Sequence, residues 1–151
     1  MNFVCNAIGY VRRREELRAV KGKEEVFREG DELRSKEATI ELLKEYCDGL
    51  DGIERGSLIW VIWYAHLSKD KPIKVHPFHD ERFPEVGVFA TRSPARPNPI
   101  GLSLCYVIDK VDCCLKVLGL DAVDSTPVLD IKLYSGGLDD PRELLKLVRR
   151  K

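Results

Sequence analysis

Residues 87–103, GVFATRSPARPNPIGLS, restrict the possible folds of this chain more than any other stretch. The segment 87–91 is short, apolar and rich in β-branched or aromatic residues, which predicts a buried strand. Three prolines then follow, and each fixes a φ angle, removes a backbone donor and pushes the preceding residue toward extended geometry. We therefore expect residues 92–99 to form a stiff loop that is neither helix nor central strand.

Arg92 and Arg96 lie within this proline-rich loop. A stiff frame loses little entropy on binding, so two guanidinium groups held on it form a pre-organised receptor for a carboxylate or a phosphate. The same residues also fit a proline-stapled turn whose arginines only cover the end of a strand. After the loop, Gly101 is expected to let the chain turn back into the next apolar run, residues 102–107.

The most hydrophobic run is residues 58–65, LIWVIWYA, which we interpret as a core strand buried on both faces. Residues 38–43 fit a strand or a helix equally well. Further strands are predicted at residues 3–11, 102–111, 115–120 and 128–134, with a tight turn near residues 112–114. A final helix is predicted to begin at Pro141, capped by Asp139 or Asp140, and to continue to Lys151.

These elements predict a mainly β fold. The chain lacks a G-x-G-x-x-G motif and an alternating strand and helix rhythm, which disfavours a Rossmann fold. Many short strands at turn-marked spacing, followed by one terminal helix, favour a single-domain antiparallel β-barrel with short helices and a C-terminal helix. The length of 151 residues fits one domain over residues 1–151.

Composition and charge limit the classes of partner. The chain is 44% hydrophobic and 33% charged, and no apolar run approaches the roughly 20 residues that a membrane span needs. The first residues have no signal-peptide pattern, so a cytoplasmic location without membrane contact is expected. Because 25 basic residues balance 25 acidic ones, nucleic acid binding requires a local basic patch.

Two features receive no functional role from the sequence. Residues 12–37 interleave acidic and basic side chains, which is typical of a solvated helix or mobile loop, although a loop that closes over a ligand has the same pattern. The five cysteines are scattered without C-x-x-C spacing, which favours small hydrophobic residues in a reducing compartment.

Carboxylates and histidines provide further candidates. Asp121 and Asp124 form a turn ahead of a proline, and such carboxylates either stabilise the turn or bind an ammonium or ribose hydroxyl. His66 follows the core strand, where a histidine is either structural or part of a site. The loop at residues 69–84 offers potential metal ligands, but their spacing favours a surface loop over a metal site. These ligands are His76, His79, Asp80 and Glu81.

Four segments together closely resemble the TrmO family, also called TsaA-like or YaeB-like. They are residues 8–11 (IGYV), 48–66 (DGLDGIERGSLIWVIWYAH), 87–103 and 120–134 (LDAVDSTPVLDIKLY). The resemblance implies a β-barrel and an S-adenosylmethionine-dependent methyltransferase that acts on threonylcarbamoyladenosine beside the tRNA anticodon. It also implies a homodimer with the cofactor near the interface.

The resemblance assigns site residues by position. The cofactor-binding set it implies is His66, Leu67, Arg92, Leu102, Leu118, Gly119, Leu120 and Asp121. Asp124 is the candidate base or orienting group. The family has glutamine where Leu67 stands, and its usual cofactor-contacting loop is not recognisable in residues 12–37.

The basic residues expected to contact tRNA are Arg96, Arg149, Arg150 and Lys151, with residues 12–14 as a further basic cluster. Two other classes of function stay open. One is a module that binds S-adenosylmethionine without methylating tRNA, and the other is a metal-dependent hydrolase that uses His76 and His79.

Overall fold

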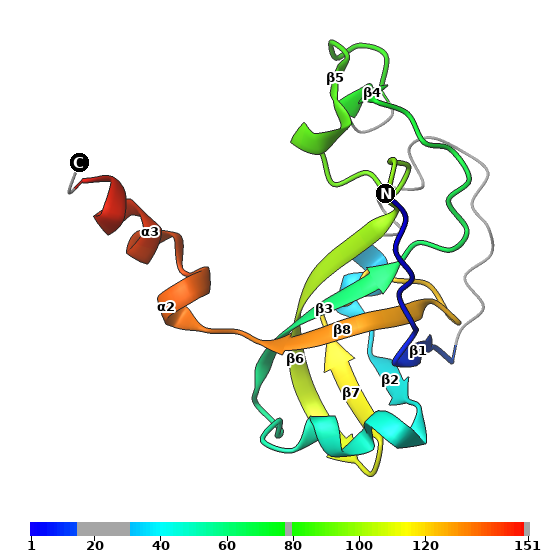
Figure 1. Cartoon of the computed structure of the whole chain (residues 1–151), viewed down its shortest axis with the longest axis vertical. Coiled ribbons are helices and arrows are strands. Elements are labelled where there is room, and N and C mark those ends of the chain that lie inside the picture. Colours follow the sequence, from blue (N-terminus) through cyan, green and yellow to red (C-terminus); the bar gives the residue numbers. More distant parts are fainter. Residues whose placement is uncertain (15–30, 78–79, 150–151) are drawn as a thin grey trace.

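The chain folds as a closed antiparallel barrel, which confirms the predicted fold class. The computed structural model describes residues 1–14, 31–77 and 80–149, and within these residues the barrel order is β1-β2-β7-β6-β3-β8 (Figure 1). The barrel strands are β1 (Gly9–Arg12), β2 (Ala38–Leu42), β3 (Leu58–Tyr64), β6 (Ile100–Val111), β7 (Cys114–Leu118) and β8 (Pro127–Leu133). β8 pairs with both β3 and β1 and so closes the sheet.

The long pair β3 and β6 shows how this sequence specifies its register. Leu58 lies opposite Tyr106, and the pairing continues to Tyr64 opposite Ile100. Alternate residues of β3 point inward and are buried, whereas Leu58 and Tyr64 are 41% and 40% exposed. The segment 58–65 is thus a strand, but the prediction that it is buried on both faces is wrong, because a barrel strand has an outer face.

The inward-facing side chains form one continuous core. Each fully buried aliphatic side chain contributes roughly 1.5–3 kcal/mol relative to leaving it exposed. The completely buried members of this core include Val11, Ile40, Ile59, Val61, Val107, Leu115, Val117, Leu120 and Val128.

Three other strand predictions need adjustment. In the predicted strand 3–11 only the last residues pair, and Phe3 and Val4 are exposed. Residues 38–43, left open between strand and helix, contain β2. The predicted buried strand 87–91 is wrong: β5 (Val86–Gly87) pairs with β4 (Lys74–Val75), and a short 3₁₀ helix, η3 (Val88–Ala90), follows. Only Val88 of that helix is buried, because one turn of 3₁₀ helix presents a single side chain to the core.

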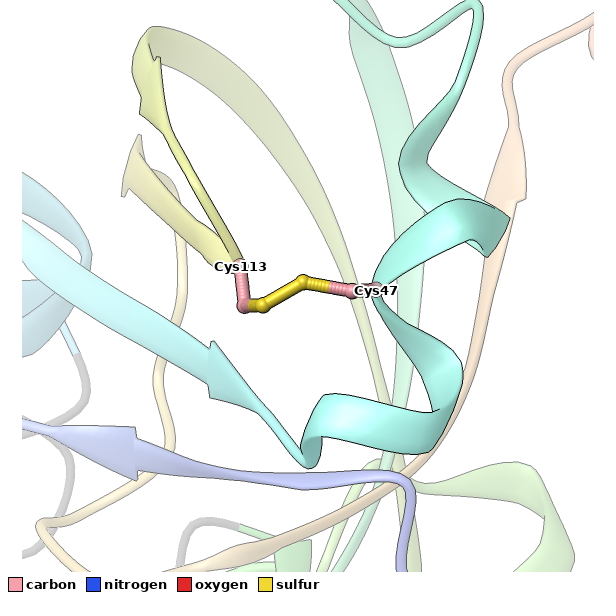
Figure 2. The surroundings of a disulfide bond; sticks show 2 residues. All are labelled: Cys47 and Cys113. Atoms are coloured by element: carbon pink, nitrogen blue, oxygen red, sulfur yellow. A yellow bond between two sulfur atoms is a disulfide. The ribbon is translucent and has the colours of Figure 1, made fainter.

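The cysteine prediction is wrong for two of the five residues. Cys47 and Cys113 form a disulfide with their Cα atoms 5.0 Å apart (Figure 2). Cys47 belongs to the 3₁₀ helix η1 (Lys44–Leu50), and Cys113 lies in the predicted turn between β6 and β7, where Asp112 adopts a positive φ. The disulfide therefore joins two segments at the same end of the barrel.

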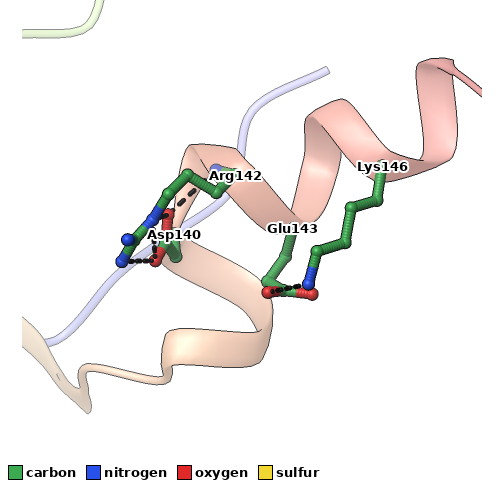
Figure 3. Close-up of polar contacts among 4 residues, drawn as sticks. All are labelled: Asp140, Arg142, Glu143 and Lys146. Carbon is green, nitrogen blue, oxygen red and sulfur yellow. Dashed lines mark hydrogen bonds and ion pairs between the residues drawn. The ribbon is translucent and has the colours of Figure 1, made fainter.

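The chain ends in a helical arm that extends away from the barrel (Figure 1). The arm comprises α2 (Gly136–Asp139) and α3 (Pro141–Val148), and α3 begins as predicted, with the Asp140 side chain accepting a hydrogen bond from Arg142 N. Along α3, Asp140 pairs with Arg142 and Glu143 pairs with Lys146 (Figure 3). Among the described helices, none is long and apolar enough to span a bilayer.

Candidate functional site

The proline-rich loop at residues 92–99 forms one end of the barrel. It is neither helix nor strand, as predicted. Its last residue, Pro99, accepts a hydrogen bond from Ala65 N at 2.7 Å, so the loop is attached to the end of β3. At its start, Thr91 Oγ1 donates to Val88 O at 2.8 Å. The loop is thus fixed at both ends as well as stiffened by its prolines.

The two loop arginines differ in how they are used. Arg96 is half-buried and its Nη1 donates to the carbonyl oxygens of Thr91 and Ser93 at 3.3 and 3.4 Å. Arg92 is exposed, and its Nη2 donates to Leu102 O. A guanidinium has further N–H groups available after one such bond. Arg92 is therefore the better placed of the two to bind an anion, whereas Arg96 closes the loop on itself.

Gly101 does not form a turn, which corrects the sequence prediction. It lies inside β6 opposite Trp63 of β3, and a Cβ on Gly101 would overlap the Trp63 indole ring. The absence of a side chain leaves room for the indole ring against the strand. Gly101 thus determines where Trp63 is placed.

The segment that follows β7 crosses the first half of β6. Gly119 has φ +96° and its N–H donates to Arg34 O at 3.0 Å. A Cβ on Gly119 would lie 2.5 Å from Leu104 O, so this close crossing requires glycine. Leu120 is buried, and the half-buried Asp121 accepts a hydrogen bond from Ser103 Oγ. Ser103 was not predicted, although a polar residue among the inward positions of β6 could have indicated it.

Arg13 holds the same segment from the other side. Its Nη2 donates to Leu120 O at 2.6 Å and its Nε donates to Ala122 O at 2.8 Å. Burial lowers the pKa of Arg13 from its ordinary value, opposed by the attraction of Asp121 and Asp124. Arg13 is thus a structural clamp, which argues against the basic cluster at residues 12–14 as a phosphate site. Arg12 is likewise paired with Glu41 at 2.9 Å.

Asp124 is exposed, and both of its carboxylate oxygens accept hydrogen bonds. Arg13 N donates to Oδ1 at 2.8 Å and Ser125 Oγ donates to Oδ2 at 3.0 Å. Burial raises the pKa of Asp124, but the hydrogen bonds from Arg13 and Ser125 hold it below its ordinary value. A carboxylate with a lowered pKa is a weak proton acceptor, so this geometry favours a role in the turn.

His66 follows directly after β3 and Ala65, close to the end of the proline-rich loop. Its Nδ1 atom is buried and has no hydrogen-bond partner among the described residues. Such buried polar atoms are normally satisfied, so an unpaired one at a candidate site is a candidate contact for a polar ligand. The adjacent Leu67 is 68% exposed.

Most of the predicted cofactor residues therefore converge. His66 follows Ala65, which is bonded to Pro99, Arg92 is bonded to Leu102, and Asp121 is bonded to Ser103. All of these contacts are at the barrel end where β3 finishes and β6 begins. We call this the loop end of the barrel.

The predicted tRNA-contacting residues do not gather at the loop end. Arg149 follows α3, which points away from the barrel (Figure 1). Arg149 forms no ion pair among the described residues, whereas Arg142 and Lys146 of α3 do. Arg150 and Lys151 lie outside the described residues, as does most of the charged segment 12–37.

Neither the Cys105 thiol nor the potential metal ligands of residues 69–84 form a reactive site among the described residues. Burial raises the pKa of the Cys105 thiol to about 12, so the thiol stays protonated and is a poor nucleophile. In the described part of the chain, no group of three or more His, Cys, Asp or Glu side chains could hold a metal ion. Asp80 pairs with Arg82 and His76 Nδ1 lies 2.9 Å from Phe83 O, while His79 is not among the described residues.

Known proteins are similar to this chain in fold and in sequence. The crystal structure of TrmO from Pseudomonas aeruginosa has a TM-score of 0.68 and is 30% identical, covering 93% of this chain and 59% of that chain. An S-adenosyl-L-methionine-binding protein of Archaeoglobus fulgidus is 44% identical over 106 residues, which are 70% of this chain and 74% of the relative. A tRNA (adenine(37)-N6)-methyltransferase of Mus musculus is 38% identical over 97 residues, or 63% of this chain and 22% of the relative.

The similarity covers only part of some relatives. The chain spans 52% of the length of a Pyrococcus abyssi relative and 27% of a longer Archaeoglobus fulgidus relative. A family model described as the tRNA-methyltransferase O N-terminal domain matches residues 18–140, which is most of the chain. The chain therefore belongs to the TrmO family, to which the sequence resemblance had pointed.

Proposed function

We propose that this chain is an S-adenosylmethionine-dependent methyltransferase that acts on N6 of threonylcarbamoyladenosine next to the tRNA anticodon. Family membership supports methyl transfer, and the mouse relative, named for N6 methylation of adenine 37 in tRNA, supports the substrate. The Archaeoglobus relative, named for binding S-adenosyl-L-methionine, supports the cofactor. On this proposal residues 1–151 act as one domain in the cytoplasm.

The observation that carries the proposal is the convergence of His66, Arg92 and Asp121 at the loop end. S-adenosylmethionine carries a carboxylate, an ammonium group and ribose hydroxyls. A guanidinium fits the carboxylate, and a carboxylate fits the ammonium or the hydroxyls. The buried and unpaired Nδ1 of His66 supplies a further polar contact. The available groups therefore match the polar groups of this cofactor.

S-adenosylmethionine supplies an electrophilic methyl group when it is bound. The chain mainly has to align that group with the acceptor nitrogen, and such positioning contributes several kcal/mol to rate acceleration. Arg92 would hold an anionic group, and residues 118–121 with Leu102 and Leu67 would line the cofactor. Asp124 remains a candidate orienting group, because its hydrogen bonds keep it ionised and in place.

The tRNA would need a local basic surface, since the chain has no net charge. Arg96 is at the loop end and Arg149 is on the distant arm. A second copy of the chain that brings its arm near the loop end would gather these residues, with Arg150 and Lys151, on one surface. Affinity for tRNA is then expected to fall steeply with salt, because phosphate contacts release counterions.

A homodimer is supported by the outer face of β3 and β6. Four cross-strand pairs there are apolar on both sides, from Leu58 with Tyr106 to Tyr64 with Ile100. The members that are more than a third exposed are Leu58, Tyr64, Ile100, Leu102, Leu104 and Tyr106. Contiguous apolar surface of this kind is typical of an interface. Leu102 also belongs to the proposed site, which would place the cofactor near the second copy.

The dimer is tested by sedimentation equilibrium. Leu58→Lys places a charge on this face at the end of β3 away from the loop end, and we expect it to yield monomers. A chain that sediments as a monomer before any substitution contradicts the dimer.

The alternative is a module that binds S-adenosylmethionine without methylating tRNA. The name of the Archaeoglobus relative, which specifies binding only, favours it, as does the distance between Arg149 and the loop end within one chain. The two functions share the cofactor site and differ in methyl transfer.

The test has two stages. Calorimetry with S-adenosylmethionine is expected to show binding that Arg92→Ala with Asp121→Ala abolishes, whereas Asp51→Ala with Arg55→Ala, at the opposite barrel end, serves as the matched control. Transfer of a labelled methyl group is then measured on tRNA with and without the threonylcarbamoyl group. Transfer to modified tRNA alone supports the proposed substrate. Cofactor binding without transfer to either tRNA supports the binding module.

A further inference from the structure

A buried chain of hydrogen bonds leads from the barrel core to Asp121. Trp63 Nε1 donates to Ser103 Oγ at 2.8 Å, and Ser103 Oγ donates to Asp121 Oδ1. Trp63 is 9% exposed and Ser103 is 5% exposed, and Ser103 is one of two buried polar residues in the described part of the chain. A hydroxyl placed in an apolar core needs such partners to offset the cost of its burial.

The donor and the acceptor in each of these hydrogen bonds follow from the chemistry of the side chains. An indole N–H can only donate, so it occupies a lone pair of the Ser103 hydroxyl. An ionised carboxylate can only accept, so the hydroxyl hydrogen points at Asp121 Oδ1. The hydroxyl therefore has one orientation, and the carboxylate receives a charge-assisted hydrogen bond from a group that cannot rotate away.

Packing fixes Trp63, the first residue of this series of hydrogen bonds. Gly101 leaves room for the Trp63 indole over β6, and Ser103 is the next inward-facing residue of that strand. Any side chain at residue 101 would displace the indole and its Nε1. Gly101 thus lies under the indole ring, and Ser103, two residues later, lies at the indole N–H.

The backbone around Asp121 is fixed as well. Arg13 donates to the carbonyl oxygens of Leu120 and Ala122, the two residues that flank Asp121. With both neighbours held and Oδ1 engaged by Ser103, the carboxylate has little conformational freedom. Its Oδ2 atom makes no hydrogen bond among the described residues, so one oxygen is left for a ligand.

We infer that Ser103 is a positioning residue that orients the Asp121 carboxylate toward the cofactor. The inference rests on the proposed function, because it assigns Asp121 to S-adenosylmethionine. A carboxylate that is already oriented loses less entropy when it binds an ammonium or a hydroxyl, so pre-organisation strengthens binding without adding a contact. Ser103 itself does not need to touch the cofactor.

The experiment compares cofactor affinity by calorimetry in three serine variants. Ser103→Ala is expected to weaken binding roughly tenfold, because a hydrogen bond to a charged group is lost. Ser103→Thr keeps the hydroxyl and is expected to restore most of the affinity. Ser57→Ala removes a hydroxyl that accepts from Glu54 N elsewhere in the chain, and is expected to bind as the unchanged chain does. If Ser103→Ala does not fold, Ser103→Cys replaces it as a weaker donor of similar shape.

A double-substitution cycle separates positioning from general stability. If Ser103 acts through Asp121, then Ser103→Ala combined with Asp121→Asn weakens binding no more than Asp121→Asn alone. In the same variants, the Trp63 indole N–H resonance is expected to shift only where Ser103 is changed to a residue without a hydroxyl.

Two outcomes overturn this inference alone while the proposed site stands. One is that Asp121→Asn weakens binding and Ser103→Ala does not. The other is that the losses from the two substitutions add. If the unchanged chain does not bind S-adenosylmethionine, the proposed function fails, and this inference fails with it.

Discussion

The two ends of the barrel are stabilised in different ways. At the loop end, side chains donate to backbone carbonyls and carboxylates, as Arg13 and Ser103 do around Asp121. At the opposite end, the Cys47–Cys113 disulfide joins η1 to the turn between β6 and β7 (Figure 2). Lys110 Nζ adds hydrogen bonds to Leu50 O and Ile53 O at 2.8 and 3.0 Å.

This difference separates stability from binding. A covalent bond and an ammonium group with two of its three donors engaged hold the disulfide end together and leave few polar atoms for a ligand. The loop end keeps such atoms, including His66 Nδ1, Asp121 Oδ2 and part of the Arg92 guanidinium. We therefore expect substitutions at the disulfide end to change unfolding more than binding, and substitutions at the loop end to do the reverse.

Removal of the disulfide is expected to have the largest effect on stability. The bond spans 66 residues, and closing a loop of this length stabilises the folded state by about 4 kcal/mol in the chain-entropy model. Cys47→Ser with Cys113→Ser should lower the denaturation midpoint accordingly, while S-adenosylmethionine affinity stays close to that of the unchanged chain. A large loss of affinity in the folded variant would show that the two ends are not independent.

Gly101→Ala is expected to have the next largest effect. The added Cβ would overlap the Trp63 indole, and overpacking of this kind typically costs about 1–3 kcal/mol. Because Trp63 also holds Ser103, the variant should lose cofactor affinity as well as stability. Gly87→Ala, where a Cβ meets no neighbouring atom, is the control. Normal affinity in Gly101→Ala would contradict the role of Trp63.

Pro94→Ala with Pro97→Ala tests whether the loop is pre-organised for binding. Pro94 is exposed and Pro97 half-buried, so each substitution should change the unfolding free energy by about 1 kcal/mol or less through unfolded-state entropy. The free energy of cofactor binding should weaken by more than the free energy of unfolding changes. A variant that unfolds outright, with normal binding by its folded fraction, would instead make the prolines structural.

Asp124→Ala is expected to have the smallest effect, and that effect should depend on pH. The pKa of Asp124 is lower in the folded chain than its ordinary value of about 3.9, so its contribution is present above pH 4 and is lost as the pH falls through the folded value. The variant should be about 1 kcal/mol less stable at neutral pH. Denaturation of both chains from pH 7 to pH 2 measures this difference. A stability difference between the two chains that grows as the pH falls would contradict this prediction.

The sequence predicted best what local chemistry determines. Proline rules identified the loop at residues 92–99, and Asp140 with Pro141 marked the start of α3. Alternation in residues 58–65 was hidden because the outer positions are apolar too, so a strand with one buried face was taken for one with two. Residues 87–91 have strand-like composition, but η3 forms there because the chain bends after its short pairing with β4.

The remaining features depend on partners that are distant in the sequence. The disulfide partners Cys47 and Cys113 are 66 residues apart, and no spacing rule connects them. Arg13 belongs to a charged run and yet forms the half-buried clamp on Leu120 and Ala122, because barrel closure places β1 beside the residues ahead of β8. The resemblance to the TrmO family supplied His66, Arg92 and Asp121, which the structure brings together. It did not supply Ser103 or Trp63.

An NMR titration of the chain with S-adenosylmethionine, following backbone amide resonances, tests most directly whether the loop end is the binding end. We predict that the shifts concentrate at the loop end, in Ser103, Asp121 and the residues after β3. The η1 helix and the turn at Cys113 should not respond. Shifts centred on η1 and that turn, or no shifts at millimolar cofactor, would contradict the claim that the loop end is the binding end.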